Sequence, residues 1–318
     1  MKTSLQRVAV IGATGQVGKV LSHALLNLGH EVLAISRGQS AGNGAALQEL
    51  ASRGAEIAFL EDLANVERLS ELLSGCDVAA VTLRVNARLV PELEPPILEA
   101  ARRAKVRRFV PDEFGVHTKA LAYGVGTIFD AKKRFHEAVI ASGLEWTLIY
   151  PGGFFDYFLP NLRFFERITT FGNLDCTFPT HALEDIGAIA AHAITDPRTA
   201  RKAVQLHANV VTQRELLQKL RQFWPDYPFE FEHVSSEEII YLKDHADPLK
   251  ISAKAGAEPD RERHGINYAI YVLGQFAALH DPDTVNAQEL YPDYLYRKPE
   301  EALIDARFVF GAKPSALL

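Results

Sequence analysis

Short apolar runs alternate with segments of helical periodicity along the first half of the chain. The runs are mostly Val, Ile, Leu and Ala, which is typical of strands buried on both faces of a parallel sheet. We predict six strands, at residues 8–11, 32–35, 56–60, 78–83, 108–111 and 146–150. Apolar spacings of three and four predict helices after the first glycines and at residues 46–53, 65–73, 93–104 and 129–142. This alternation indicates an α/β fold with a doubly wound parallel sheet.

The pattern changes after Pro151. Seven aromatic residues are concentrated within residues 154–171. The pairs Thr212 with Glu215 and Ser235 with Glu238 have the spacing of a capping box and predict two helix starts. Polar residues 243–264 predict a surface loop, and apolar residues 267–276 suit a helix or a strand equally. We therefore expect a domain at residues 1–150 and a smaller substrate-covering region at 151–318, some of which packs back on the sheet.

The bulk composition limits the classes of partner. With 318 residues, 47% of them hydrophobic, the chain is long enough to bury a full core. The formal net charge of −6 disfavours nucleic acid or an anionic membrane, and the basic residues within 102–108 are interpreted as a solvated helix end. No apolar stretch is long enough to span a membrane, and we expect no signal peptide. Cys76 and Cys176 form neither a disulfide framework nor a metal-ligand spacing, so we expect a cytoplasmic protein without a metal site.

A glycine-rich turn follows the first predicted strand. Gly12, Gly15 and Gly18 stand three positions apart, between an apolar run and a helical segment. Glycines in this context permit a tight turn, close approach of the backbone to a pyrophosphate, and close packing of helix on strand. The N–H groups at the helix N-terminus then favour phosphates. The alternative is a turn with a purely structural role, but the strand and helix on both sides favour a dinucleotide-binding domain of the Rossmann type.

The end of the second strand indicates which dinucleotide binds. Ser36, Arg37 and Gly38 stand where an acid normally meets a free ribose 2′-hydroxyl, and no acid follows before Glu49. Because arginine suits a 2′-phosphate, we predict NADP(H); the alternative is that Arg37 is a solvated charge at a strand end. The predicted cofactor-binding residues are Gly12, Thr14, Gly15, Gln16, Val17, Gly18, Arg37, Thr82 and Phe154.

Ligands in doubly wound sheets bind beyond the carboxyl ends of the strands. Six segments occupy such ends, and we expect them to converge on one cleft. They are residues 12–15, 37, 62, 82–84, 111–114 and 151–154.

The Tyr-x-x-x-Lys pair of ordinary short-chain dehydrogenases is missing, because isoleucine and phenylalanine stand four positions before Lys132 and Lys133. Lys132 lies at the edge of the apolar face of the predicted helix 129–142, where this helix opens toward the cleft. Lys133 is expected to point to solvent with His136 and Glu137. A partly desolvated lysine can have a lowered pKa and act as a general base near neutrality. The alternative is that Lys132 is a solvated charge on an amphipathic helix.

Several motifs, in order along nearly the whole chain, resemble the isoflavone reductase-like family. The segment RRFVPDEFG at residues 107–115 is similar to the family motif Arg-Phe-Phe/Leu/Ile-Pro-Ser-Glu-Phe-Gly. Further similar segments are GATGQVG with Arg37, FDAKKRFHEAVIASGLEWTLI, GFFDYFLP, GINYAIYVLGQF and ELYPDYLY. This family includes pinoresinol–lariciresinol, phenylcoumaran benzylic ether and isoflavone reductases, within the NmrA-like atypical short-chain dehydrogenases.

The resemblance implies a catalytic role for Lys132. The family carries its catalytic lysine in a Phe-x-x-Lys motif, which FDAK at residues 129–132 matches. By this resemblance Lys132 takes or returns the proton of a substrate phenol. Phenolate formation expels a benzylic ether oxygen, and hydride from NADPH adds to the quinone methide. The implied activity is NADPH-dependent reduction of phenolic aromatic substrates, foremost lignan benzylic ethers of the pinoresinol type, by a homodimer.

The aromatic residues after Pro151 suit the walls of a site for a small aromatic substrate, the alternative being ordinary core. For Phe154 both interpretations stay open, whereas Phe164 and Phe165 are expected in the core. The candidate substrate-binding residues are Val116, His117, Phe155, Tyr157 and Phe158.

The chain also departs from the family pattern. Asp112 replaces the family's serine and adds an acid near the cofactor, and Val116 stands where relatives often carry Asn or His. His117 would either assist proton transfer through water or lie in a surface loop. Residues 39–48 lack the lysine that helps some relatives hold the 2′-phosphate, which leaves Arg37 as the determinant. Two other functions stay open: reduction of a quinone, an isoflavone-like enone or an allylic ester, and an NmrA-like regulator that senses NADP without turnover.

Overall fold

Eight parallel strands form the central sheet. The computed structural model describes residues 5–40, 42–158, 161–162, 164–252, 259–276 and 281–304. Across the sheet the order is β13 (Thr284–Asn286), β10 (Lys202–Gln205), β6 (Glu145–Tyr150), β5 (Arg108–Val110), β4 (Val78–Val81), β1 (Arg7–Ile11), β2 (Glu31–Ser36) and β3 (Glu56–Phe59). All neighbouring pairs are parallel. The predicted doubly wound parallel sheet is confirmed, and the six predicted strands are β1 to β6, with ends shifted by at most two residues.

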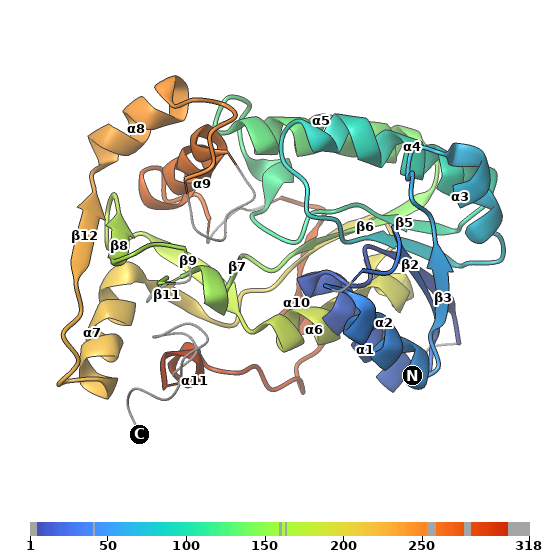
Figure 1. Cartoon of the computed structure of the whole chain (residues 1–318), viewed down its shortest axis with the longest axis horizontal. Coiled ribbons are helices and arrows are strands. Elements are labelled where there is room, and N and C mark those ends of the chain that lie inside the picture. Colours follow the sequence, from blue (N-terminus) through green and yellow to red (C-terminus); the bar gives the residue numbers. More distant parts are fainter. Residues whose placement is uncertain are drawn as a thin grey trace.

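Helices cover both faces of this sheet (Figure 1). One face carries α1 (Gln16–Asn27), α2 (Gly44–Ser52) and α6 (Leu183–Thr195), and the other carries α3 (Val66–Leu72), α4 (Leu89–Arg103) and α5 (Thr127–Ala141). The strand β1 shows why both faces need cover. Val8 and Val10 pack in the cluster that includes α1 and α6, whereas Ala9 and Ile11 pack in the cluster that includes α4 and α5. All four side chains are fully buried, as a wholly apolar strand requires.

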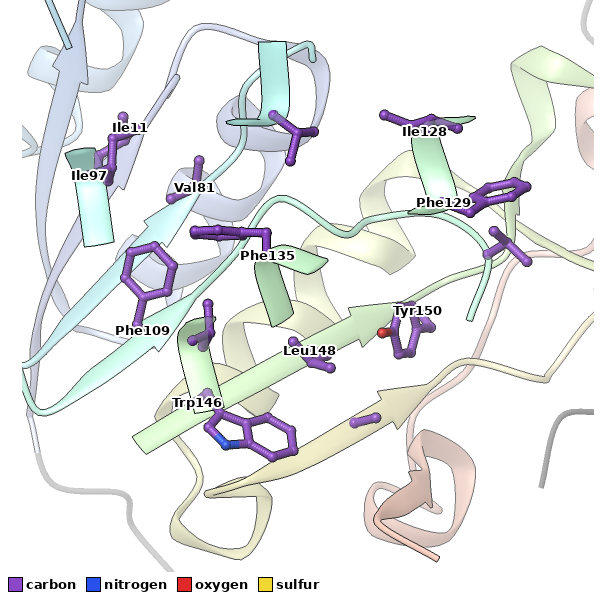
Figure 2. Close-up of a cluster of buried hydrophobic side chains, with 14 of the residues drawn as sticks. Ile11, Val81, Ile97, Phe109, Ile128, Phe129, Phe135, Trp146, Leu148 and Tyr150 are labelled. Atoms are coloured by element: carbon purple, nitrogen blue, oxygen red, sulfur yellow. The ribbon is translucent and has the colours of Figure 1, made fainter. Parts of the chain in front are cut away.

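The core on the α4 and α5 side extends to the carboxyl edge of the sheet (Figure 2). Phe109 of β5 meets Phe135 of α5 edge to face, with ring centroids 6.2 Å apart. Phe129 in the first turn of α5 and Tyr150, the last residue of β6, continue the same cluster. The side chains that carry α5 are therefore fixed up to the edge where ligands bind in such sheets.

After β6 the chain builds a smaller region and also returns to the main sheet. One small sheet has the order β11 (Val210–Thr212), β9 (Thr177–His181), β7 (Gly153–Phe154), and another pairs β12 (Phe231–Val234) with β8 (Ile168–Phe171). Around them lie α7 (Gln213–Phe223), α8 (Ser236–His245), α9 (Asp260–Tyr271) and α11 (Pro299–Ile304), while α10 (Ala287–Leu290) follows β13 (Figure 1). Since β10, β13 and α6 belong to the main layers, residues after 150 contribute to both regions. Within the described residues no helix is both long and apolar enough to cross a membrane.

The start of α4 differs from the prediction. The helix begins at Leu89 instead of residue 93, because Asn86 Oδ1 accepts hydrogen bonds from the N–H groups of Arg88 at 3.1 Å and Leu89 at 3.0 Å. Pro95 and Pro96 lie inside this longer helix, and each removes a main-chain hydrogen-bond donor there.

In the C-terminal half the predicted helix starts are confirmed, whereas the predicted surface loop is wrong in part. The capping box of Thr212 with Glu215 is confirmed in both directions, and Ser235 accepts from the Glu238 N–H at 3.1 Å. The surface loop expected at 243–264 is wrong at both ends, because α8 extends to His245 and α9 begins at Asp260. Residues 253–258 lie outside the described residues. The undecided segment 267–276 is helical up to Tyr271.

Arg108 is buried, contrary to the interpretation of residues 102–108 as a solvated helix end. Its side chain is 0% exposed and donates to the carbonyl oxygens of Ile194 at 3.1 Å and Asp196 at 2.8 Å, at the end of α6. It also contacts the Glu145 carboxylate at 3.2 Å. The guanidinium thus satisfies carbonyls that have no partner within their own helix. These partners are 86 and 88 positions away, so local periodicity could not indicate them.

Candidate active site

A cavity of about 620 Å³ lies at the carboxyl ends of the central strands. The turn after β1 and the segments after β4, β5 and β6 all line it, as the expected convergence requires. The first turn of α5, the helix α9 and the aromatic segment after β7 complete its wall. Arg37 and Asp62 are the exceptions to the expected convergence, because they follow the outer strands β2 and β3 and do not line this cavity.

The glycine turn is packed so tightly that larger residues do not fit. Gly12 has a φ of +91°, and a Cβ there would lie 2.7 Å from the carbonyl oxygen of Thr82. A Cβ on Gly18 would lie 2.3 Å from the carbonyl oxygen of Gly12. Thr82 closes the turn from β4, since its Oγ1 donates to the carbonyl oxygen of Ile11 at 3.0 Å. These contacts bring α1 close against β1 and leave the backbone of the turn open to the cavity.

The N-terminus of α1 has the properties of an anion-binding site. The helix begins at Gln16, and no side chain accepts a hydrogen bond from its first N–H groups, because the residue at the N-cap is Gly15. The first turn of the helix carries no acidic residue. Thr14, Gly15, Gln16 and Val17 line the cavity. The first N–H groups of a helix have no intrahelical acceptor, and the dipole favours negative charge there. This end of the cavity therefore fits the pyrophosphate of a dinucleotide.

Arg37 and Phe154 lie at different places around the turn. Arg37 is exposed after the last residue of β2 and makes no hydrogen bond or ion pair with the described residues, so its guanidinium is available to an anion. It lies outside the lining of the cavity. Phe154 ends β7, is half-buried, and lines the cavity beside the turn.

Lys132 faces the cavity from the first turns of α5. Its side chain is 12% exposed, and its Nζ donates to the carbonyl oxygens of Asp112 at 2.5 Å and Glu113 at 3.3 Å. The Asp112 Oδ2 lies 3.9 Å from the same Nζ. Asp112, Glu113 and Lys132 all line the cavity. The segment after β5 thus holds the ammonium group with two main-chain acceptors and one carboxylate.

The expected lowering of the pKa of Lys132 is wrong. Burial does lower the pKa of this ammonium, but the carboxylates of Asp112 and Glu113, with those of Glu94 and Glu262, outweigh it and raise the pKa above its usual value. Lys132 is therefore a cation at neutral pH. The reason is the environment: burial favours the neutral amine only where nearby acids do not hold the proton.

The acids around Lys132 differ in protonation. Burial raises the pKa of the Asp112 carboxyl to about 7, although Lys132 opposes the rise. Burial also raises the pKa of Glu94 well above its ordinary value, and the charge of Asp112 adds to this. Glu94 Oε2 accepts from the Asp112 N–H at 3.2 Å, while its Oε1 is buried without a hydrogen-bond partner among the described residues. Burial therefore favours the protonated form of both carboxyl groups.

Glu113 is ionised and fully engaged. Burial opposes its charge, but His136, Lys132 and the hydroxyl of Thr118 lower the pKa of this carboxyl below its usual range. Its Oε1 contacts His136 Nε2 in a short hydrogen bond, and its Oε2 accepts from Thr118 at 2.6 Å. His136 was expected at the solvent side of α5, but it is 3% exposed because Glu113 binds it from the segment after β5. Lys133 is half-buried and donates to the Leu121 carbonyl oxygen.

His117 is buried, so the surface-loop alternative is wrong. It is 1% exposed, and its ring stacks on Tyr150 with centroids 4.3 Å apart. Its Nε2 is hydrogen-bonded with Thr284 Oγ1 at 2.7 Å. Burial lowers the pKa of His117 to about 4, which leaves it neutral. His117 does not line the cavity, and its Nε2 is engaged with Thr284 of β13. This position does not suit proton transfer to a ligand in the cavity.

The aromatic residues divide between wall and core. Val116, Tyr157 and Phe158 line the cavity. Phe164 and Phe165 line it as well, and they also pack in the core as expected, since Phe164 is 7% exposed and Phe165 packs against the main cluster. Tyr157 is 39% exposed and packs edge to face on Phe154 at 5.5 Å. Phe158 also belongs to the core, since it stacks on Phe178 at 4.1 Å. Phe155 lies outside the lining and packs on Ala182.

Several residues of this site were not predicted from the sequence. Glu113 belongs to the segment 111–114, which was expected at the cleft, but it was not named as a site residue. Glu94, Glu262 and Asn267 could not have been singled out, because they come from α4 and α9. Asn267 lines the cavity and is 7% exposed, and its Nδ2 has no hydrogen-bond partner among the described residues. The described residues contain no group of three or more His, Cys, Asp or Glu side chains that could hold a metal ion.

Comparison with known proteins shows the family of the chain. The model of the NmrA-like family matches residues 4–301. Isoeugenol synthase 1 of Petunia hybrida is 27% identical over 319 residues, which cover 95% of this chain and 94% of that protein. Phenylcoumaran benzylic ether reductase PT1 of Pinus taeda is 28% identical over 320 residues, with 94% and 98% covered.

A solved structure shares the fold. The binary complex of leucoanthocyanidin reductase with NADPH from Vitis vinifera matches with a TM-score of 0.80 at 20% identity. The match covers 95% of this chain and 99% of that chain.

Proposed function

The chain belongs to the NmrA-like family, and on that premise we propose that it is an NADPH-dependent reductase of phenolic aromatic substrates. The observation that carries this proposal is the position of Lys132. Its ammonium group faces a cavity that has an anion-binding helix N-terminus on one side and aromatic walls on the other. The most direct substrate class is the benzylic ether of the pinoresinol type, in which a phenol stands para to the reacting carbon.

The cofactor would occupy the glycine turn and the adjoining wall. Residues 14–17 would hold the pyrophosphate through the N-terminus of α1, while Gly12 and Gly18 allow the backbone to approach it. Thr82 and Phe154 would flank the nicotinamide half, because both line the cavity beside the turn. Arg37 would meet the 2′-phosphate from the end of β2. When bound, NADPH supplies the hydride for the benzylic carbon.

Lys132 would act as a cation on the phenol oxygen. Because its pKa is raised, it donates a hydrogen bond and stabilises the negative charge that forms as the phenol loses its proton. The phenolate then expels the ether oxygen from the para benzylic carbon, which leaves a quinone methide that accepts hydride. Val116, Tyr157 and Phe158 would contact the aromatic rings. His117 and Phe155 take no part, because neither lines the cavity.

The proposal is tested by NADPH oxidation with a panel of substrates. The panel contains pinoresinol, its bis-O-methyl ether, a phenylcoumaran, a quinone, an isoflavone and an allylic ester of a phenolic propenol. We expect reduction of pinoresinol or the phenylcoumaran and none of the bis-O-methyl ether, which cannot form a phenolate. Equal reduction of pinoresinol and its methyl ether would contradict the phenolate mechanism.

The other functions remain distinguishable in the same assay. Reduction of only the quinone, the isoflavone or the allylic ester would keep the cofactor and change the substrate. A relative named isoeugenol synthase supports including the allylic ester, because its name denotes a phenol with a propenyl side chain. NADPH binding without reduction of any compound would favour the regulatory alternative. A homodimer in the cytoplasm stays a prediction, which sedimentation and fractionation would test.

A further inference from the structure

We propose that Asp112 accepts the phenol proton, while Lys132 remains a cation that binds the resulting phenolate oxygen. This inference rests on the proposed function and assigns the proton to a particular atom of the site. It separates two roles, proton acceptor and charge stabiliser, that a single catalytic lysine would otherwise combine.

The geometry singles out the Asp112 carboxylate. It lines the cavity beside Lys132, with Oδ2 3.9 Å from Nζ, so one phenol oxygen can approach both groups. No described residue donates a hydrogen bond to its carboxylate oxygens, and the 3.9 Å ion pair of Oδ2 with Lys132 is the carboxylate's one charged contact among the described residues. The hydrogen bonds of Asp112 with Lys132 and Glu94 involve its main chain. Its side chain is 11% exposed. Asp112 is therefore a buried carboxylate with free acceptor positions at the cavity wall.

Each neighbouring acid differs from Asp112 in its position or in its hydrogen bonds. Both carboxylate oxygens of Glu113 are occupied, one by His136 and one by Thr118. Glu94 does not line the cavity and turns one oxygen to the Asp112 N–H. Glu262 does line the cavity, but its Oε2 accepts from the Ala87 N–H at 2.8 Å. Lys132 is excluded as acceptor because an ammonium has no lone pair.

Burial and the surrounding charges together set the pH at which Asp112 can act. The charged groups next to Asp112 are Glu94 on α4, Glu113 in the segment after β5 and Lys132 on α5. The other charged residues that line the cavity are Arg84 after β4 and Glu262 and Arg263 of α9. Burial raises the pKa of Asp112 to about 7, with Lys132 opposing and Glu113 adding to the rise. A general base is most effective when its pKa lies near the working pH.

The proton and the electrons balance without a further reactant. The phenol O–H bond breaks and its proton moves to a carboxylate oxygen of Asp112, while Lys132 stabilises the phenolate. A lone pair of the phenolate oxygen forms the carbonyl bond of the quinone methide, and ring π electrons shift to form its exocyclic C=C bond. The benzylic C–O bond breaks, and its electron pair leaves with the ether oxygen. The departing alkoxide takes the proton from Asp112. Hydride addition restores the aromatic phenolate, which takes one proton from solvent.

The first test is the pH profile of kcat/KM for Asp112→Asn, with Glu137→Gln as matched control on the exposed face of α5. We expect wild type and the control to lose activity below an apparent pKa of about 7. The profile of Asp112→Asn should lack this acidic limb, and its kcat/KM should be about 10²- to 10⁴-fold below that of wild type. An unchanged limb or unchanged activity in Asp112→Asn would overturn the proposal.

The second test needs no turnover and separates this inference from the proposed function. Calorimetry compares binding of 2-methoxy-4-propylphenol and its O-methyl ether to the NADP⁺-loaded protein at about pH 8. We expect wild type and Glu137→Gln to prefer the phenol by about tenfold or more, as for a hydrogen bond to a charged acceptor. Asp112→Asn should lose this preference. A preserved preference in Asp112→Asn, or no binding of either compound to wild type, would overturn the inference even if the enzyme reduces another substrate.

Discussion

At the scale of single residues, the chemistry of Lys132 depends on the acids that surround it. Replacing Lys132 with methionine keeps much of the side-chain length and removes the charge. We expect kcat/KM for a phenolic substrate to fall by about 10²- to 10⁴-fold, because a stabilised anion loses its cation. NADPH binding, followed by fluorescence titration, should persist, because Lys132 is not part of the glycine turn. A Lys132→Met enzyme with wild-type kcat/KM would contradict the catalytic role.

In the proposed site we expect Arg37 to decide between NADPH and NADH. In Arg37→Ala the dissociation constant of NADPH should rise by about tenfold or more, because a charge-assisted contact to the 2′-phosphate is lost. The constant for NADH should stay nearly unchanged. Arg102→Ala removes an equal charge at the far end of α4 and serves as control. Equal effects of Arg37→Ala on both dinucleotides would refute the assignment.

Asn267 presents a buried amide nitrogen without a described partner. In the free protein such a group is unfavourable, so Asn267→Leu should raise the free energy of unfolding by about 1 kcal/mol. The same change should weaken substrate binding, because the cavity loses a hydrogen-bond donor. Gln213→Leu is the matched control, since that amide exchanges two hydrogen bonds with Phe171. Gln213→Leu should lower the free energy of unfolding by about 1–3 kcal/mol. An equal loss of stability in Asn267→Leu, measured by denaturant melts, would contradict the prediction.

At the scale of elements, the contact of α1 with β1 depends on Gly18. A Cβ there would meet the Gly12 carbonyl oxygen at 2.3 Å, and no flexible side chain can move to relieve this contact. We expect Gly18→Ala to cost about 1–3 kcal/mol in the free energy of unfolding and to weaken NADPH binding. At Gly38 no atom lies within 4 Å of an added Cβ, so Gly38→Ala is the control for the change in stability. A Gly18→Ala protein with wild-type stability and NADPH affinity would contradict the packing role.

The elements themselves were predictable where their signals are local. The apolar runs of β1, β2 and β4 and the capping box of Thr212 need only neighbouring residues, and these predictions are confirmed. The start of α4 was missed because Asn86 accepts from the first N–H groups of the helix, which begins at Leu89, four residues before the start that the apolar pattern predicted. The burial of Arg108 was missed because its partners are the carbonyl groups of α6, which only the tertiary fold brings near.

At the scale of the whole molecule, the glycine turn on one side of the cavity could be predicted from the sequence, whereas the cluster of acids around Lys132 on the other side could not. The glycine turn is contiguous, so its residues and their place at the cavity could be predicted. The acids around Lys132 come from α4, the segment after β5 and α9, and their joint effect reverses the pKa shift expected from burial alone. Local periodicity indicated that Lys132 faces a cleft, but it carried no information about the charges across that cleft.

The buried acids also predict how stability of the whole protein changes with pH. Burial raises the pKa of Asp112 from 3.8 to about 7, so the folded state keeps this proton over a range in which the unfolded chain releases it. Between about pH 4 and pH 7 the contribution of Asp112 to the free energy of unfolding therefore falls as pH rises, and above that range the loss is constant.

Asp112→Asn should remove this loss in the free energy of unfolding, because asparagine does not titrate. At about pH 8 the variant should exceed wild type in the free energy of unfolding by up to about 4 kcal/mol, and near pH 4 the two should be equal. Denaturant melts of wild type, Asp112→Asn and Glu137→Gln at a series of pH values measure this difference. If Asp112→Asn were less stable than wild type at about pH 8, the attraction to Lys132 would outweigh the burial of the carboxylate. Asp112 would then be ionised well below neutrality, and the site would hold a strong ion pair in place of a proton acceptor.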